Sequence, residues 1–372
     1  NVQIGYFGFG RAGFDYFIDN RNTITLTGNM ARGQFKPENF SDIYILNDYA
    51  PSTGKQDTAL RTPRQANTVG NFRNWGSQLS FKHNFPKPGS EWTADITYNQ
   101  GRNDNRTDIV TENYLRSNGS EQFFGAINQL QTVNGTNKNL VVQTDYVRPL
   151  TSNSKLELGA RVAIRQFESV TQQQILGKNS IVGYNNEDRV YAAYANFSNR
   201  IKNFSYQAGL RAESALNKGV LNEKQPFELD FPISLFPSVF LSQKLNESSD
   251  LQLNLSRRIN RPNFFQLFPF TDYTDSLNIS RGNPALQPEF TYGAELGYSK
   301  TFKNRDNFIA SIYFKYNDQL ITRFLQGEFD TFLKRNVIVN TFINANSSYI
   351  TGLELTGRNK LTKWWDLTSN AN

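Results

Sequence analysis

The sequence predicts an all-β protein, a transmembrane antiparallel up-and-down β-barrel. Three observations predict it: long stretches in which apolar and polar residues alternate, connections that alternate between short and long, and aromatic residues near the short connections. Side chains alternate between the two faces of a strand, so each such stretch has one apolar face and one polar face.

The clearest alternation is in LELGARVAIRQF, residues 156–167, where Leu158 and Val162 fall on one side and Arg161 on the other. Similar stretches lie at residues 23–31, 77–85, 91–100, 204–214, 251–259, 307–317 and 349–358. We expect about fourteen such strands, many of about 10 to 16 residues, whereas strands in soluble proteins have about 5 or 6. A tilted strand needs about 9 to 11 residues to cross a bilayer. The lengths therefore favour a membrane barrel over a soluble sandwich.

The expected connections are of two kinds. Short ones lie at residues 86–91, 149–155, 200–204, 244–250 and 301–307. Long ones lie near residues 33–72, 103–138, 168–188, 217–234, 261–289 and 325–340. Outer-membrane barrels have tight turns on the periplasmic side and longer loops on the cell surface. The pattern therefore predicts a barrel whose two ends differ in this way.

Aromatic residues make up 14% of the chain, and many lie near the short connections. The residues concerned are Phe17, Phe85, Trp92, Tyr146, Phe204, Phe302, Phe308, Trp364 and Trp365. Tyrosine and tryptophan favour the level of the lipid headgroups, where the ring and its polar atom are both satisfied. The alternative is a row of aromatic residues in the core of a soluble sandwich.

Hydropathy excludes membrane helices. The mean hydropathy is −0.58, and the sequence has no apolar run of about 18 residues. Within hydrocarbon every backbone polar group must be paired internally, so strands span a bilayer only as a closed ring. Such strands have one polar face, which accounts for the low hydropathy.

The composition also argues against catalysis. The sequence contains no cysteine and one histidine, His83, which leaves no thiolate chemistry and makes a zinc site or a Ser-His-Asp triad a poor interpretation. We therefore expect no enzyme activity, no metal and no cofactor. The formal net charge of +7 comes from scattered residues, so nucleic acid is not an expected partner. The charge suits contact with outer-membrane lipid and lipopolysaccharide.

The most distinctive stretch is residues 256–300. Its notable elements are Arg258, Arg261-Pro262, Gln266-Leu267, Pro269, Asp272-Tyr273, Asn278, Gly282-Asn283-Pro284, Leu286, Pro288-Glu289 and Glu295-Leu296-Gly297-Tyr298. This stretch resembles a signature of the TonB-dependent receptor-like outer-membrane β-barrel family of the Bacteroidota. Residues 346–355 and 363–372 resemble the same family, so the resemblance covers essentially the whole chain.

The resemblance implies a 22-stranded barrel closed by an N-terminal plug domain. Residues 1–372 are then expected to be a barrel segment of about fourteen strands, with the plug domain and the terminal strands outside them. A complete 14-stranded pore is an alternative, because bacterial barrels have even strand numbers. The implied partners are the plug domain, an inner-membrane energy-coupling protein, and a surface lipoprotein or other envelope subunits.

Three sets of residues are candidates for a role. Loops carry function on rigid scaffolds, so the ligand-binding candidates are Phe264, Phe265, Phe268, Asp272, Tyr273 and Arg281. Side chains expected to face the lumen and contact the plug are Glu157, Arg161, Arg165, Arg211, Glu213, Arg258, Glu295, Glu354 and Arg358. Residues expected to set loop geometry are Asn283, Pro284, Pro288 and Glu289.

The resemblance implies uptake of a large or scarce substrate through the barrel. A barrel subunit that transports nothing and docks other envelope proteins is the first alternative, and an enzyme built into a barrel wall is the second. A plug with a coupling box would favour transport over the first alternative. The position of His83 makes the enzyme the weakest interpretation.

Overall fold

Most of the chain forms one large antiparallel sheet. The computed structural model describes residues 2–46, 58–117, 120–222, 225–269, 271–273, 278–302 and 306–372. Fourteen strands pair in this order: β1 (Val2–Phe17), β2 (Asn22–Leu46), β3 (Thr58–Asn84), β4 (Glu91–Ser117), β5 (Ser120–Pro149), β6 (Ser154–Ile175), β7 (Lys178–Ile201), β8 (Phe204–Leu221), β9 (Gln225–Asn246), β10 (Ser249–Asn260), β13 (Glu289–Thr301), β14 (Asn307–Asp318), β17 (Ser347–Lys360) and β18 (Asp366–Ala371). The predicted up-and-down all-β fold is confirmed, with β1 and β18 at the two edges of the sheet.

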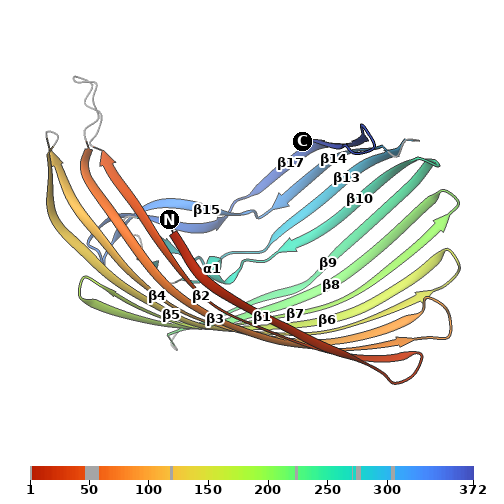
Figure 1. Cartoon of the computed structure of the whole chain (residues 1–372), viewed down its shortest axis with the longest axis horizontal. Coiled ribbons are helices and arrows are strands. Elements are labelled where there is room, and N and C mark those ends of the chain that lie inside the picture. Colours follow the sequence, from red (N-terminus) through yellow and green to blue (C-terminus); the bar gives the residue numbers. More distant parts are fainter. Residues whose placement is uncertain are drawn as a thin grey trace.

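The remaining elements form a small second sheet, which we call the loop sheet. It pairs β11 (Thr271–Asp272), β12 (Asn278–Arg281), β16 (Arg335–Asn344) and β15 (Ile321–Asp330) in that order. β11 and β12 belong to the connection from β10 to β13, and β15 and β16 to the connection from β14 to β17. Helix α1 (Phe264–Leu267) precedes β11, and no helix in the described residues could span a bilayer. In Figure 1 the large sheet is strongly curved, and α1 and β15 lie on its concave side.

The large sheet has a convex and a concave face, and the strand register identifies them. Leu26, Leu79, Ile96, Val142, Val162 and Tyr191 are direct cross-strand partners from β2 to β7. Direct partners lie on the same face of a sheet. Arg161 and Arg165, on the other face of β6, line a cavity together with Leu267 of α1. The leucine–valine row is therefore convex, and its apolar stretch on β6, residues 156–164, is close to the about 9 to 11 residues that a bilayer crossing needs.

The same alternation runs on through the second half of the sheet. Tyr206, Leu241, Leu253, Leu296, Ile312 and Leu353 are direct partners from β8 to β17. Near the short turns, aromatic residues add to this convex face: the rings of Phe81 and Trp92 lie 5.5 Å apart, and those of Phe204 and Tyr206 lie 6.0 Å apart. The indole of Trp92 donates a hydrogen bond to the Thr144 hydroxyl at 2.7 Å.

The prediction of long loops was wrong in four places. Within the expected loop at residues 33–72, residues 33–46 and 58–72 are strand; residues 103–138, 168–188 and 217–234 are mostly strand, and β5 alone has 30 residues. β6 and β7 are joined by a tight turn in which Leu176 and Gly177 both have positive φ, the conformation that suits the twist of a hairpin. Beyond the apolar band both strand faces are polar, as in QFESVTQQQ from Gln166 to Gln174. The backbone ladder continues there without an alternating pattern to reveal it.

Candidate functional site

The long connection from β10 to β13 folds back against the concave face instead of extending away from the sheet. We call residues 261–289 the lumen segment. Helix α1 begins with a reciprocal cap, because the Asn263 amide oxygen accepts a bond from the Gln266 backbone (3.1 Å) and the Gln266 side chain accepts one from the Asn263 backbone (2.8 Å). Leu267 and Leu286 are fully buried. The described part of the segment is therefore packed in the protein interior.

Two side chains of the lumen segment join it to β15 and β16. The Asn283 amide donates to the Phe342 carbonyl at 2.9 Å, and a Glu289 carboxylate oxygen accepts a bond from the Ile321 amide at 3.0 Å. Pro288 is buried, whereas Pro284 is exposed. Asn344 adds bonds to the Gln287 backbone of 2.8 and 2.9 Å. Sequence reasoning missed Asn344, because nothing near it in the chain marks a partner so far away.

A cavity of about 530 Å³ lies between the loop sheet and the concave face of β4, β5 and β6, and we call it the amide cavity. Asn103, Asn105, Gln131 and Asn340 are among the residues that line it. The Asn105 side-chain oxygen is buried, and no donor among the described residues bonds to it. Buried polar atoms in native proteins almost always have a partner, so this acceptor in the lining of the cavity is unusual in lacking one.

Three of the ligand-binding candidates, Phe268, Asp272 and Arg281, line the amide cavity. Arg281 also forms an ion pair with Glu328 of β15 at 2.8 Å. The ring of Phe268 packs at 4.5 Å from that of buried Tyr184 on β7, so it anchors the lumen segment to the wall. Tyr184 was missed by sequence reasoning, since it is one aromatic residue in a polar stretch.

Tyr273, a fourth ligand-binding candidate, is not among the residues that line this cavity. The Tyr273 hydroxyl donates to Asp330 at 3.0 Å, and its ring lies 5.1 Å from that of Phe332. Burial, followed by the bond to Asp330, raises the pKa of Tyr273 to about 12. Tyr273 therefore holds the loop sheet together, around the buried core of Ile279, Val337 and Val339. Phe264 and Phe265 lie in α1, and their side chains are outside the described part of the structure.

A second cavity, of about 610 Å³, lies where α1 meets β6, β7 and β8, and we call it the charged cavity. Four of the lumen candidates line it: Arg161, Arg165, Arg211 and Glu213. Glu213 is 7% exposed and pairs with Arg211 at 2.6 Å and with Arg261 of the lumen segment at 2.5 Å. Arg165 lies 3.8 Å from Asp188. The ion pair of Glu213 with Arg261 thus joins the wall to the lumen segment.

The remaining lumen candidates lie on the concave face away from these cavities. Glu157 pairs with Lys155 at 2.7 Å, and Arg358 with Asp366 at 3.5 Å. Arg258, Glu295 and Glu354 alternate with the convex leucines of β10, β13 and β17. Across the described residues no group of three or more acidic or histidine side chains is placed to hold a metal ion.

Replacing Gly282 with alanine should loosen the loop sheet. A Cβ at this position would overlap the backbone carbonyl and amide of Phe268, and overpacking of this kind costs about 1 to 3 kcal/mol. We expect faster hydrogen exchange in β12 and β16 of the full-length protein. Gly327→Ala in β15 is the matched control, because a Cβ there would meet no atom within 4 Å. Equal exchange rates for both variants would contradict the close approach.

Comparisons with known proteins agree with this architecture. The profile of the outer membrane protein beta-barrel family matches residues 83–372, whereas no curated protein sequence matches the chain. The structure of the alcaligin outer membrane receptor FauA from Bordetella pertussis has a TM-score of 0.50 at 13% identity, covering 99% of this chain and 59% of the receptor. The copper transporter OprC has a TM-score of 0.51 at 12% identity, covering 99% and 60%.

At these identities the two structures show the fold alone, and the chain spans about three-fifths of their length. The family match covers most of the chain, including the lumen segment and the loop sheet. The convex apolar band accords with strands that face lipid. The chain belongs to the outer membrane protein beta-barrel family and lies in the outer membrane of a Gram-negative bacterium.

Proposed function

We propose that the chain is the barrel portion of a TonB-dependent receptor that takes up a large or scarce solute. The observation that carries this proposal is the position of the lumen segment, which places Asp272 and Arg281 at the amide cavity beside the unpaired oxygen of Asn105. Polar groups that converge in a cavity are the usual form of a solute-binding site. The cavity offers both charges and several amides, which suits a polar solute.

The proposal includes partners beyond these residues. A plug domain would fill the concave side, where the inward charges of β10 to β17 have room for it, and an inner-membrane protein would supply the energy. The low identity of the alcaligin receptor and the copper transporter leaves the solute open, since a shared fold does not determine function. Specificity would come from the loop sheet and the wall facing it.

An uptake assay with complemented cells tests this function. Cells that lack the gene would be complemented with the full-length wild type, with Asn105→Leu/Arg281→Gln, or with the control Gln326→Ala, an exposed residue of β15. Each strain would be offered siderophores, copper, oligosaccharides and peptides. We expect uptake of one class to require both the gene and the energy-coupling protein. The cavity variant should raise the half-saturating concentration at least about tenfold, the loss expected for one charge-assisted hydrogen bond.

If no class of solute depends on the gene, the transport proposal is wrong. Isolation of the full-length protein with a fixed set of envelope proteins would then favour the docking subunit. If uptake depends on the gene but the cavity variant behaves as the wild type, transport stands and the amide cavity is not the binding site.

A further inference from the structure

Three arginines form a row across the convex face of β2, β3 and β4. Arg32 is the direct partner of Arg73, and Arg73 is the direct partner of Arg102. All three are exposed. The register of β2 with β3 and of β3 with β4 is unbroken from this row to the apolar row of Leu26, Leu79 and Ile96. The arginines therefore lie on the face that carries the lipid-facing residues. Asn103 and Asn105 of β4, which line the amide cavity, confirm that Arg102 points the other way.

The row lies just above the apolar band, on the side away from the short turns. Between the band and the row are Trp75 and Tyr98, whose rings lie 5.2 Å apart. Such aromatic pairs are typical of the headgroup level. Short turns are periplasmic in outer-membrane barrels, so the arginines are at the height of the outer leaflet's headgroups, which in this membrane belong to lipopolysaccharide.

The charge of this row is largely uncompensated. Arg102 pairs with Asp104 at 3.2 Å, whereas Arg32 and Arg73 have no ion pair among the described residues. Directly opposed residues have Cβ atoms about 4.5 to 5.5 Å apart, and like charges at that distance are destabilising. Lys36 and Glu38, both exposed on this face of β2, add one charge of each sign and leave the row positive.

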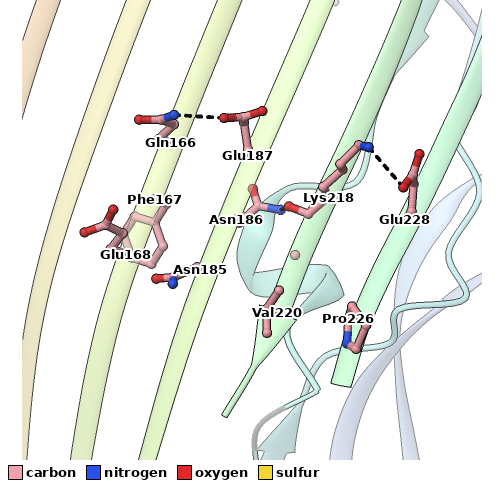
Figure 2. A pocket seen from close by; sticks show the side chains of 11 residues that line it. Gln166, Phe167, Glu168, Asn185, Asn186, Glu187, Lys218, Val220, Pro226 and Glu228 are labelled. Carbon is pink, nitrogen blue, oxygen red and sulfur yellow. Dashed lines mark hydrogen bonds and ion pairs between the residues drawn. The ribbon is translucent and has the colours of Figure 1, made fainter. Parts of the chain in front are cut away.

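On the convex face of β6 to β9 the charged side chains have partners of opposite charge, as Figure 2 shows for Lys218 and Glu228. There a groove of about 580 Å³ runs over β6 to β9, and its basic residue Lys218 pairs with Glu228 at 3.1 Å. Gln166 donates to Glu187 at 2.8 Å, and Glu187 also pairs with Arg189. Basic side chains over β7 to β9 thus have acidic partners in the sheet itself. In the row over β2 to β4, Arg102 alone has such a partner among the described residues.

We propose that Arg32, Arg73 and Arg102 bind the phosphate groups of lipopolysaccharide. Arginine suits phosphate because its planar guanidinium can donate two parallel hydrogen bonds to one group. A phosphate between two adjacent guanidiniums would turn their mutual repulsion into two attractions. The acyl chains of the same molecule would lie along Leu79 and Ile96, with Trp75 and Tyr98 at the boundary. The site is independent of solute uptake, since it lies on the opposite face from both cavities.

The test compares two lipids and matched variants of the full-length protein, purified in detergent and freed of bound lipid. The probes are diphosphorylated lipid A and the same lipid without phosphates, and calorimetric titration measures their affinities. We expect the wild type to bind the phosphorylated form at least about tenfold more tightly. Arg32→Gln/Arg73→Gln should remove this preference. Arg189→Gln/Lys218→Gln, which removes the same charge from paired positions on the same face, should keep it.

Other outcomes have defined meanings. Arg32→Lys/Arg73→Lys should keep part of the preference, because charge remains and the paired hydrogen bonds are lost. Unchanged heat-dependent gel mobility would show that each variant is folded. The proposal is overturned if Arg32→Gln/Arg73→Gln retains the preference, or if the paired-position variant loses it equally. It is also overturned if the row instead mediates contact with a second copy, seen as a dimer that these substitutions dissociate.

Discussion

Replacing Val162 with arginine is expected to prevent the full-length protein from assembling in the outer membrane. Val162 lies in the middle of the convex apolar row, between its direct partners Val142 and Tyr191. A lipid-facing arginine near the bilayer midplane costs about 2 to 4 kcal/mol, a large share of the about 5 to 15 kcal/mol that stabilises a typical folded protein. Heat-dependent gel mobility of membrane fractions, and urea titration of protein refolded into lipid vesicles, would measure the loss.

Val170→Arg is the matched control for this substitution. Val170 is on the same strand and the same face, beyond the apolar band and between Glu168 and Gln172. A charge outside the hydrocarbon costs about 0 to 1 kcal/mol, so this variant should assemble normally. Normal insertion of Val162→Arg, or equal losses for the two variants, would contradict the assignment of the convex band to lipid.

Glu213→Ala should release the lumen segment from the wall. Glu213 is buried and lies between Arg211 of β8 and Arg261 of the lumen segment. Its removal leaves Arg211 and Arg261 without their ion pairs, with only the longer-range attraction of Asp188 for Arg261 remaining. Breaking a buried pair costs about 3 to 5 kcal/mol, and we expect about 3 because Arg211 keeps contact with water. Faster hydrogen exchange and protease cleavage within residues 261–269 of the full-length protein would measure the release.

Glu157→Ala is the control for Glu213→Ala. Glu157 is also a concave-face carboxylate, but it pairs with one exposed lysine, Lys155. An exposed pair contributes about 0 to 1 kcal/mol, so exchange in the lumen segment should not change. If Glu213→Ala leaves the segment as protected as Glu157→Ala does, the ion pairs of Glu213 do not hold it.

The sequence predicts this fold well where lipid lies on one side of a strand. Along residues 156–164 the environment differs between the two faces, so the side chains alternate and the strand can be recognised. The prediction failed just beyond, from Gln166 to Ile175, because most side chains on both faces are polar there, although the face from Ser169 to Ile175 is buried. The backbone ladder needs no apolar residue to continue, so the hairpins extend far past the band.

The candidate site could be predicted from the sequence only in part. The motif around Asp272 and Arg281 marked the lumen segment, and the structure brings both residues to the amide cavity. The loop sheet could not be predicted, because β12 and β16 pair in parallel across a long stretch of chain, with Ile279 opposite Val339. No local pattern specifies so distant a partner. The wall residues that line the other side of the cavity, such as Asn105, could not be predicted for the same reason.

The most direct test of the account is a spin-label scan along β6 in the full-length protein in its membrane. These residues contain no cysteine, so single cysteines at positions 157 to 163 each report one site in this part of the protein. We predict that oxygen, which concentrates in lipid, relaxes labels at 158, 160 and 162 most strongly, whereas a water-soluble nickel chelate relaxes those at 157 and 161. The opposite phase, or no period of two, would contradict it.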